Sequence, residues 1–497
     1  MIRIDRNSER SLQTQIYDEI RDAIVRGTLK PGEQLPVSRI LAEQLVISRN
    51  TVMFAYDRLI AEGYIVPRPR AGMFVNDKIP ETGILSQNPF AIPFNPGDRI
   101  RLGKNPSFSA RAPVLWKESS RRPQFDFSVG RPHPRSFPSK FWQRSIVRHL
   151  TGVRAPQAEY GDPTGLLQLR EAIARHLKMT RGMEVHPSQI LITAGIQGAL
   201  NVLSRMFFTG HVSPSVAIEN PGYQGAVHLF NSYGASIFPV DVDEDGLIVS
   251  RLSDFRGSLV YVTPAHQFPT GYTMALDRRL NLLDWAYRTG SFIIEDDYDS
   301  DFRYDGPNPT SLAGLDKRGH VIYLGTFSKS IGPGLRLGYA VLPGYLMDQA
   351  RIIKVLLDHG TPWLDQIVVA DFLNEGAFLR HVRRMRQFYR QLRDTAIEEI
   401  ETRFPGSILS GRESGMHMMW QLPENFPSAQ EIEQIALGCG VGIHQFSNSA
   451  AHEYGLGGRF RGRSLVLGYA GLNEEDIRQA MARLAPAIQS YMERKTS

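Results

Sequence analysis

The chain has 497 residues, too many for one hydrophobic core, so we expect two or more domains. Apolar residues make up 42% and charged residues 22% of it, as in ordinary soluble globular proteins, and no stretch approaches the roughly 20 apolar residues of a membrane span. The single cysteine, Cys439, excludes a disulfide framework and a cysteine-built zinc site. Because the polar start of the chain also lacks a secretory signal, we expect a cytoplasmic protein that binds neither a metal ion nor a membrane.

The net charge of +6 lies entirely within residues 1–125, because the rest of the chain is neutral overall. Such asymmetry favours a polyanion as the partner of that part of the chain. A solvated, charge-rich surface would give the same count, so charge alone does not decide between these two interpretations.

The first part of the chain carries the pattern of three helices. Isoleucines recur every four residues from Ile16 to Ile24 and form one apolar stripe. Ser38 is expected to cap a short helix that ends near residue 45, and Ser48 a second helix over residues 49–62. Two helices joined by so short a turn predict a helix-turn-helix.

After the third predicted helix, residues 64–75 have the pattern of strand, turn and strand, and Arg68 and Arg70 decorate the turn. We interpret this segment as a wing with a basic tip. The helix before it begins with side chains of the kinds that reach base edges and phosphates, namely Ser48, Arg49, Asn50 and Thr51.

The segment RGTLKPGEQLPVSRILAEQLVISRNTVMFAYDRLIAEGYIVPRPRAGMFV resembles the winged-helix domain of GntR-type bacterial transcription regulators along nearly its whole length. The resemblance implies a winged helix-turn-helix domain over residues 1–75 that binds double-stranded operator DNA. The pattern and the resemblance together assign these DNA contacts: Arg39, Ser48, Arg49, Asn50, Thr51, Arg68, Arg70 and Gly72.

Residues 76–124 are rich in proline, glycine and polar side chains, and no apolar period persists in them. We interpret this stretch as a linker. A tether of this length would let the bodies on its two sides move relative to each other.

Residues 125–490 alternate short apolar strands with amphipathic helices, the strands being QILITAG, SVAIEN, GSLVYVTP, SFIIEDDY and HVIYLGTF. This alternation predicts an α/β fold with an open, mostly parallel sheet. In such sheets ligands bind beyond the carboxyl ends of the strands. The polar residues that follow these strands are therefore the candidates for a site.

Two strand ends carry groups that could bind opposite ends of a ligand. The first leads through a glycine into a helix, whose free amides at Ile196 and Gln197 can hold a phosphate. The second ends in EDDYDS, where the strand alternation places Asp296 and Tyr298 on one face and Asp297 on the other. One face therefore presents a carboxylate and a phenol together.

A third strand, VIYLGT, leads to Lys329, with Thr326 before it and Arg336 after a glycine-proline-glycine turn. A lysine, a carboxylate, a phenol, an arginine and a phosphate cradle are the groups that hold pyridoxal 5′-phosphate. The lysine amine reacts with the aldehyde, and the carboxylate pairs with the pyridine nitrogen. Tyr223, in ENPGYQG, adds an aromatic ring that can stack on the cofactor.

Residues 125–490 resemble the fold-type-I aminotransferases on the motifs YGDPTGLLQLREAIARHL, NPGY, HQFPTG, EDDYDS and TFSKSIGPGLRLGY. The resemblance implies a mostly parallel α/β main domain with a smaller C-terminal α+β part. It makes Lys329 the catalytic lysine that bonds to the cofactor, Asp296 the partner of the pyridine nitrogen and Tyr298 the partner of the ring hydroxyl. The other implied cofactor ligands are the stacking ring of Tyr223, Arg336 at the phosphate, His266 near the ring hydroxyl and Tyr160, which reaches the phosphate of a neighbouring subunit.

The two halves together resemble the MocR-type regulators, a GntR subfamily with an aminotransferase-like effector domain. HQFPTG and EDDYDSDFRY are close to the versions of these motifs in that subfamily. The resemblance implies a head-to-tail homodimer that regulates transcription. Its effector would be pyridoxal phosphate itself, with control of vitamin B6 synthesis, or an amine that reacts with the bound cofactor. The alternative is an active aminotransferase with a DNA-binding appendage.

One departure from the aminotransferase pattern bears on this choice. Near the C-terminus these enzymes carry an arginine that binds the substrate carboxylate. Here the strand reads SLVLGYAGL, with Val466 at that position. Arg459, Arg461 and Arg463 lie just upstream and are the candidates to replace it, with solvated loop charge as the other interpretation. We therefore expect no efficient transamination of an ordinary amino acid.

Overall fold

The computed structural model describes residues 4–6, 8, 10–69, 71–77, 123–151, 159–455, 459–460 and 462–496. The chain divides into two compact units, Met1–Lys104 and Asn105–Ser497, and each is described by itself. Most of the predicted linker lies outside the described residues, as do Arg70 and Arg461. None of the helices in the described part of the chain is long and apolar enough to cross a membrane.

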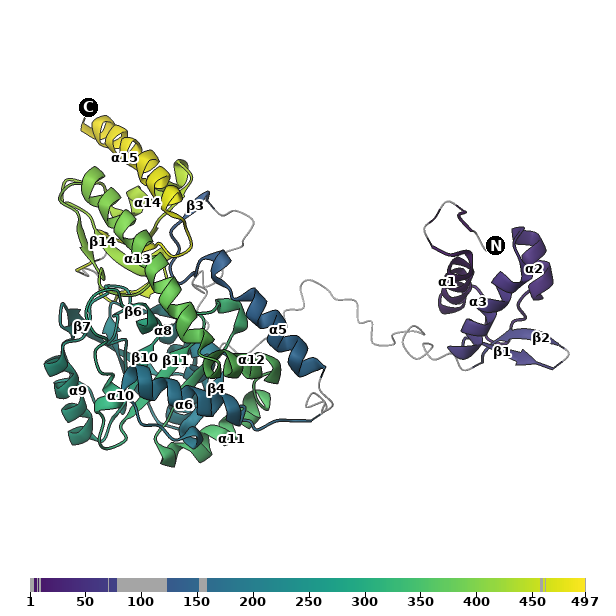
Figure 1. Cartoon of the computed structure of the whole chain (residues 1–497), viewed down its shortest axis with the longest axis horizontal. Helices are drawn as coiled ribbons and strands as arrows, with labels where there is room; N and C mark the ends of the chain where they lie inside the picture. Colours follow the sequence, from purple (N-terminus) through teal and green to yellow (C-terminus); the bar gives the residue numbers. More distant parts are fainter. Residues whose placement is uncertain are drawn as a thin grey trace. The chain divides into compact units, whose positions relative to one another are not determined.

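The N-terminal unit consists of three helices and a two-stranded sheet (Figure 1). Their bounds are α1 Leu12–Val25, α2 Ser38–Leu45, α3 Arg49–Ala61, β1 Ile65–Arg68 and β2 Gly72–Val75. The strands pair antiparallel with Arg68 opposite Gly72, which is the predicted wing. The core contains the predicted stripe from Ile16 to Ile24, packed with Leu59 of α3 and other apolar side chains of the unit.

The two serines at the predicted helix starts have different roles. Ser48 caps α3, because its hydroxyl accepts a hydrogen bond from the amide of Thr51 at 3.2 Å. The prediction that Ser38 caps α2 is wrong: the cap position is Val37, which has no side-chain acceptor, and Ser38 is already inside the helix and buried.

The C-terminal unit is built on an eight-stranded sheet, in the order β4-β12-β11-β10-β9-β5-β7-β8. The five adjacent strands from β11 to β7 run parallel, whereas β12 is antiparallel to both of its neighbours and β8 is antiparallel to β7. The bounds are β4 Ile190–Thr193, β5 Ser215–Asn220, β7 Ser236–Asp243, β8 Gly246–Leu247, β9 Leu259–Val262, β10 Phe292–Asp297, β11 Val321–Thr326 and β12 Gly338–Val341.

Helices cover both faces of this sheet (Figure 1). Ile294 faces one core with α7 Gly195–Phe208, α8 Gln224–Ser232 and α11 Met347–Asp358. Ile293 faces the opposite side. The helices on that side are α5 Ser139–Leu150, α6 Leu167–Arg181, α9 Leu276–Thr289, α10 Leu312–Leu315 and α12 Trp363–Asn374. Alternate residues of the strands therefore pack into two cores, as strand geometry requires.

A smaller C-terminal part has its own sheet, in the order β13-β14-β18-β16, packed on helices. The bounds are β13 Ile408–Ser410, β14 His417–Gln421, β16 His444–Gln445, β18 Ser464–Gly468, α13 Ala377–Arg403, α14 Ala429–Gly438 and α15 Glu474–Thr496. Two short pairs complete the unit: β3 Phe125–Asp126 with β15 Val441–Gly442, and β6 Gly222–Tyr223 with β17 Ala451–His452. The predicted fold class, a mostly parallel α/β domain with a smaller α+β part and a winged helix-turn-helix, is confirmed.

Candidate functional site: a cavity at the strand ends and an exposed helix face

A cavity of about 240 Å³ lies where β10 and β11 end and α7 begins. Eight of the ten residues predicted to bind a cofactor line it: Lys329, Asp296, Tyr298, Tyr223, Arg336, Thr326, Ile196 and Gln197. They come from segments up to 140 positions apart in the chain. The position agrees with the rule that parallel sheets bind ligands at the carboxyl ends of their strands.

Lys329 follows β11 and is partly buried. Its Nζ donates a hydrogen bond to the carbonyl of Gly130 at 3.1 Å. A β-carbon on Gly130 would lie 2.3 Å from Nζ, so a larger residue there would push the amine out of this position. Burial lowers the pKa of Lys329, and the carboxylates of Asp299 and Asp296 oppose this shift. A larger share of the amine is therefore unprotonated, the form that reacts with carbonyl groups.

Asp296 is buried at the end of β10 with half of its hydrogen-bonding capacity unused. Oδ2 accepts a hydrogen bond from the hydroxyl of Tyr261 on β9 at 2.5 Å. Oδ1 has no hydrogen-bond partner among the described residues. Burial raises the pKa of Asp296 to about 7. A cationic N–H donor in the cavity would supply the missing partner and stabilise the charged form.

The other end of the cavity collects groups that bind anions. The Arg336 guanidinium lies at the start of α7, with Nη2 3.3 Å from the carbonyl of Ala194. A β-carbon on Gly195, whose φ is +70°, would come within 3.0 Å of that nitrogen, so glycine permits the close approach. The free amides of the first turn of α7 and the hydroxyls of Thr326 and Ser328 complete a phosphate-sized set of donors. Ser328 was not among the predicted ligands.

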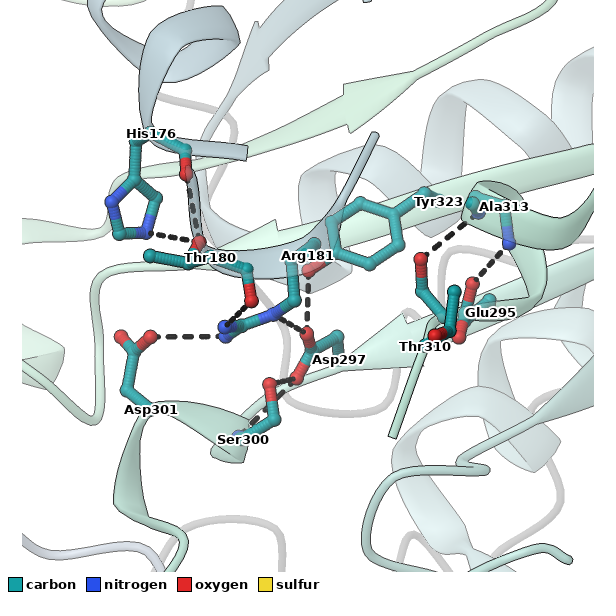
Figure 2. Close-up of polar contacts among 12 residues, drawn as sticks. His176, Thr180, Arg181, Glu295, Asp297, Ser300, Asp301, Thr310, Ala313 and Tyr323 are labelled. Atoms are coloured by element: carbon teal, nitrogen blue, oxygen red, sulfur yellow. Dashed lines mark hydrogen bonds and ion pairs between the residues drawn. The ribbon is translucent and has the colours of Figure 1, made fainter. Parts of the chain in front are cut away.

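The other two acids of the EDD run, Glu295 and Asp297, form hydrogen bonds with residues that do not line the cavity (Figure 2). Asp297 accepts hydrogen bonds from Arg181 Nε at 2.8 Å and from the hydroxyl of Tyr323. Burial alone would raise the pKa of Asp297, but Arg181 and these hydrogen bonds hold it below its ordinary value. Glu295 accepts the amides of Leu312 and Ala313 at the start of α10, at 2.9 and 2.8 Å. Separate partners thus allow three adjacent acids at one strand end.

The sequence predicts His266 beside the ring hydroxyl of the cofactor, but His266 does not lie on the cavity wall. Its carbonyl accepts a hydrogen bond from the Tyr298 hydroxyl at 2.9 Å, and its Nδ1 lies 2.9 Å from Asp299 Oδ2. His266 therefore supports Tyr298 from behind. Asp299, Met416 and His417 do line the cavity and were not predicted. His266, Asp299 and His417 have ligand atoms within 4.8 Å of one another, but the His266–Asp299 hydrogen bond already uses one of them.

The remaining predicted residues of this unit lie away from the cavity. Tyr160 is 90% exposed and contacts the ring of His359. Arg463 donates its hydrogen bonds to backbone carbonyls, among them that of Phe426 at 2.8 Å. Arg459 lies 3.9 Å from Glu244. Neither arginine lines the cavity, so neither replaces the carboxylate-binding arginine in this structure.

The predicted DNA contacts lie on α3, at its N-cap, on the wing and, for Arg39, on α2. Asn50 and Arg49 are exposed, and Arg49 Nε is 3.4 Å from Ser38 Oγ. Phe54, which the sequence analysis did not single out, is 63% exposed one turn after Asn50 on the same face. An exposed aromatic ring on this face is a signal that only the structure gives, because the sequence alone does not show which apolar residues leave the core.

Of the other predicted DNA contacts, the two arginines interact with neighbouring side chains and the glycine shapes the turn of the wing. Arg39 on α2 pairs with Glu43 at 3.1 Å, and both side chains are exposed. Arg68 lies over the ring of Phe74 and 3.6 Å from Asp77. Gly72 has a φ of +111°, a conformation that favours glycine, and so fixes the turn of the wing.

Comparisons with known proteins agree with both halves. Residues 12–75 match the family described as bacterial regulatory proteins, gntR family, and residues 123–484 match aminotransferase class I and II. The probable rhizopine catabolism regulatory protein MocR of Rhizobium meliloti is 34% identical over 98% of this chain and 96% of its own length. The pyridoxine biosynthesis transcriptional regulator PdxR of Corynebacterium glutamicum is 30% identical over 96% of each chain.

Solved structures support the larger half. The multiple substrate aminotransferase of Thermococcus profundus aligns with a TM-score of 0.68 at 27% identity, covering 78% of this chain and 98% of that one. These two relatives span both halves and are named as regulators, whereas this neighbour matches the larger half. The chain therefore belongs to the MocR-type regulators of the GntR family, in which a winged helix-turn-helix is joined to an aminotransferase class I and II domain.

Proposed function

We propose that this protein is a cytoplasmic, DNA-binding transcriptional regulator whose C-terminal unit binds pyridoxal 5′-phosphate. The observation that carries the proposal is a single cavity lined by Lys329, Asp296 and Arg336, each of which matches a different group of the cofactor. Lys329 offers an amine of lowered pKa, Asp296 a buried oxygen without a donor among the described residues, and Arg336 a guanidinium beside free helix amides. These are the groups that the two ends of this cofactor require.

The residues present fit the cofactor in the following way. Asp296 would accept the protonated pyridine nitrogen, Tyr298 would contact the ring hydroxyl and Tyr223 would stack on the ring. Arg336 and Thr326, with the amides of α7, would take the phosphate. The cofactor supplies an aldehyde that reacts reversibly with primary amines. The protein orients that aldehyde toward Lys329 Nζ and keeps the amine poised for reaction through its contact with the Gly130 carbonyl.

The exposure of Tyr160 is compatible with a role in a second subunit. We include in the proposal a head-to-tail homodimer in which Tyr160 reaches the phosphate bound by the partner. A 90% exposed tyrosine that does not line the cavity of its own chain is what such an arrangement would leave in a single chain.

DNA is the proposed ligand of the N-terminal unit. With α3 in the major groove, Arg49 and Asn50 would face base edges, and Phe54 would pack on a thymine methyl group. Arg39 on α2 and Arg68 on the wing would contact phosphates. Binding in the C-terminal unit would change the preferred geometry of the dimer, and so the fit of two winged helices to two half-sites.

A regulatory role is better supported than transamination. A working aminotransferase needs a cation for the substrate carboxylate, and Val466 is buried in an apolar cluster where that arginine would be. One relative that spans both halves is named a regulator of pyridoxine biosynthesis, which favours the cofactor itself as the signal and vitamin B6 synthesis as the target.

The test is a titration of the cofactor-free protein with pyridoxal 5′-phosphate, followed by visible absorbance and by binding to the DNA upstream of its own gene. We expect a new absorbance band together with a change in DNA affinity. In Lys329→Ala both responses should disappear while DNA binding without the cofactor stays normal. The matched control is Lys140→Ala, an exposed lysine of the same unit. A Lys329→Ala protein that responds normally in DNA binding would refute the proposal.

A further inference from the structure

The cavity has a second wall that the cofactor groups do not use. Its residues are Val129, Phe268, Asp299, Met416, His417 and Ala450, and we call this set the second wall. Three of them, Met416, His417 and Ala450, come from the smaller C-terminal part. In the sequence they lie far beyond the strands that lead to Asp296 and Lys329. A second molecule that enters the cavity to reach the cofactor would contact this wall. The chemistry of the second wall therefore selects which molecules can bind there.

The second wall contains no positive charge. Among the described residues that line the whole cavity, the cations are Lys329 and Arg336. Lys329 is proposed to bond to the cofactor, and Arg336 lies at the start of α7, where the phosphate would be. A carboxylate on a second molecule would therefore find no free cation among these residues, and burying an unpaired carboxylate is unfavourable by several kcal/mol.

The strand behind the second wall is apolar. Val466 on β18 pairs with Met419 on β14, so both side chains are on the same face of the small sheet. Both are buried in a cluster with Phe268, Phe446 and Phe460. This packing fills the place from which an arginine on β18 would reach the cavity.

The second wall offers two polar groups, the ring of His417 and the carboxylate of Asp299. His417 Nε2 is buried and has no partner among the described residues. Burial, His266 and Lys329 lower the pKa of His417 well below its ordinary value. The ring is therefore neutral, and a hydroxyl, which both donates and accepts, can form a hydrogen bond with Nε2. Asp299 adds a carboxylate, whose Oδ2 lies 2.9 Å from His266 Nδ1.

We propose, resting on the function proposed above, that the cofactor-loaded cavity takes a second ligand, a hydroxylated primary amine without a carboxylate, which acts as an effector beside the cofactor. Its hydroxyl forms a hydrogen bond with His417 Nε2, and its carbon skeleton packs on Phe268 and Met416. Amino alcohols and amino sugars have this chemistry, whereas amino acids do not. The wall thus accepts donors and excludes anions, the opposite of a site built around an arginine.

When the cofactor is bound, its aldehyde carbon would supply the bond to the effector amine. The effector would replace Lys329 at that carbon, the two hydrogens lost by the effector nitrogen would be gained by Lys329 Nζ, and Lys329 would be released as a free amine. This exchange involves no oxidation or reduction, so it needs no further reactant.

The test compares three small primary amines on the cofactor-loaded full-length protein: ethanolamine, ethylamine and glycine. They share an aminomethyl group and carry on it a hydroxymethyl, a methyl and a carboxylate group. The readouts are the visible absorbance of the bound cofactor and the affinity for upstream DNA. We expect ethanolamine to act at a concentration about 2–10-fold lower than ethylamine, the value of one hydrogen bond, and at least about tenfold lower than glycine.

Two variants assign the preference to the second wall. His417→Phe should make ethanolamine and ethylamine equal, whereas His211→Ala, an exposed histidine of the same unit, should preserve the difference. A normal cofactor band with glycine acting at the lowest concentration would overturn the inference and leave the proposed function intact. Ethanolamine and ethylamine acting equally on the unmodified protein would also overturn it. A protein with no cofactor band would overturn both.

Discussion

Replacing Asp296 with asparagine should stabilise the cofactor-free protein at alkaline pH and weaken its binding of pyridoxal 5′-phosphate. Burial raises the pKa of Asp296 from 3.8 to about 7. The folded protein therefore holds a proton on this group between about pH 4 and 7, where the unfolded chain has lost it. Because the folded state binds more protons in this window, stability falls as the pH rises through it.

The size of the effect follows from the pKa difference. One pKa unit corresponds to about 1.4 kcal/mol, so the ionised carboxylate costs the folded protein about 4 kcal/mol at pH 8. Asparagine removes the charge, and its oxygen can still accept the Tyr261 hydroxyl. Its amide group would occupy the place of Oδ1, which has no partner among the described residues, at a cost of about 1–3 kcal/mol. We expect a net stabilisation of about 1–3 kcal/mol at pH 8 and little difference at pH 5.

The assay is thermal unfolding of the C-terminal unit within the full-length protein at pH 5 and pH 8. Burial also raises the pKa of Glu219 and Glu295 to about 7. Glu295 contributes equally to both proteins, whereas the charge of Asp296 adds to the shift of Glu219, so the measured difference belongs to Asp296 together with its effect on Glu219. Asp254→Asn, at an exposed aspartate, is the control. Added pyridoxal phosphate should raise the melting temperature of the unmodified protein at pH 8 and have little effect on Asp296→Asn. An identical pH dependence in the two proteins would refute the reasoning.

Three further predictions concern both units. Arg49→Ala should weaken operator binding by about 1–3 kcal/mol if Arg49 reads a base, and Arg26→Ala should not; equal affinities in a gel-shift titration would make Arg49 a surface charge. In the unmodified protein, replacing the contacted thymine with uracil should weaken DNA binding by about 0.8 kcal/mol, and Phe54→Ala should abolish this difference. A uracil effect that persists in Phe54→Ala would exclude a contact between Phe54 and the methyl group. Arg181→Met should destabilise the C-terminal unit by about 3–5 kcal/mol in urea unfolding, because it leaves Asp297 buried without its cation, and adding Asp297→Asn should restore part of that loss; no recovery would mean that packing, and not charge, is responsible.

Strand-end reasoning found the centre of the candidate site because its main groups follow strands directly. Asp296 and Lys329 come from adjacent parallel strands, and the alternation of side chains along β10 separates Asp296 from Asp297 in the structure as expected. The partners of these groups could not be found in the same way. Arg181 is 116 residues from Asp297, and no local pattern marks that pair.

Errors in the sequence interpretation also have physical causes. Serine is a residue type that favours the cap position, but α2 begins at Ser38 itself, one residue earlier than predicted, and the serine is buried inside the first turn. His417 belongs to a sheet that is distant in sequence from every cofactor motif, so its place on the cavity wall depends on how the smaller part packs on the larger. Such packing is a tertiary property that short motifs do not encode.

The hydrophobic core of the N-terminal unit has a consequence for how such genes arise. The buried residues of its core cluster that the structure describes all lie between Ile16 and Val75, within the residues that match the gntR family. A recombination event in the DNA that encodes the following segment would therefore keep this cluster whole. The same effector body could in this way be connected to new promoters, in evolution or in a laboratory biosensor.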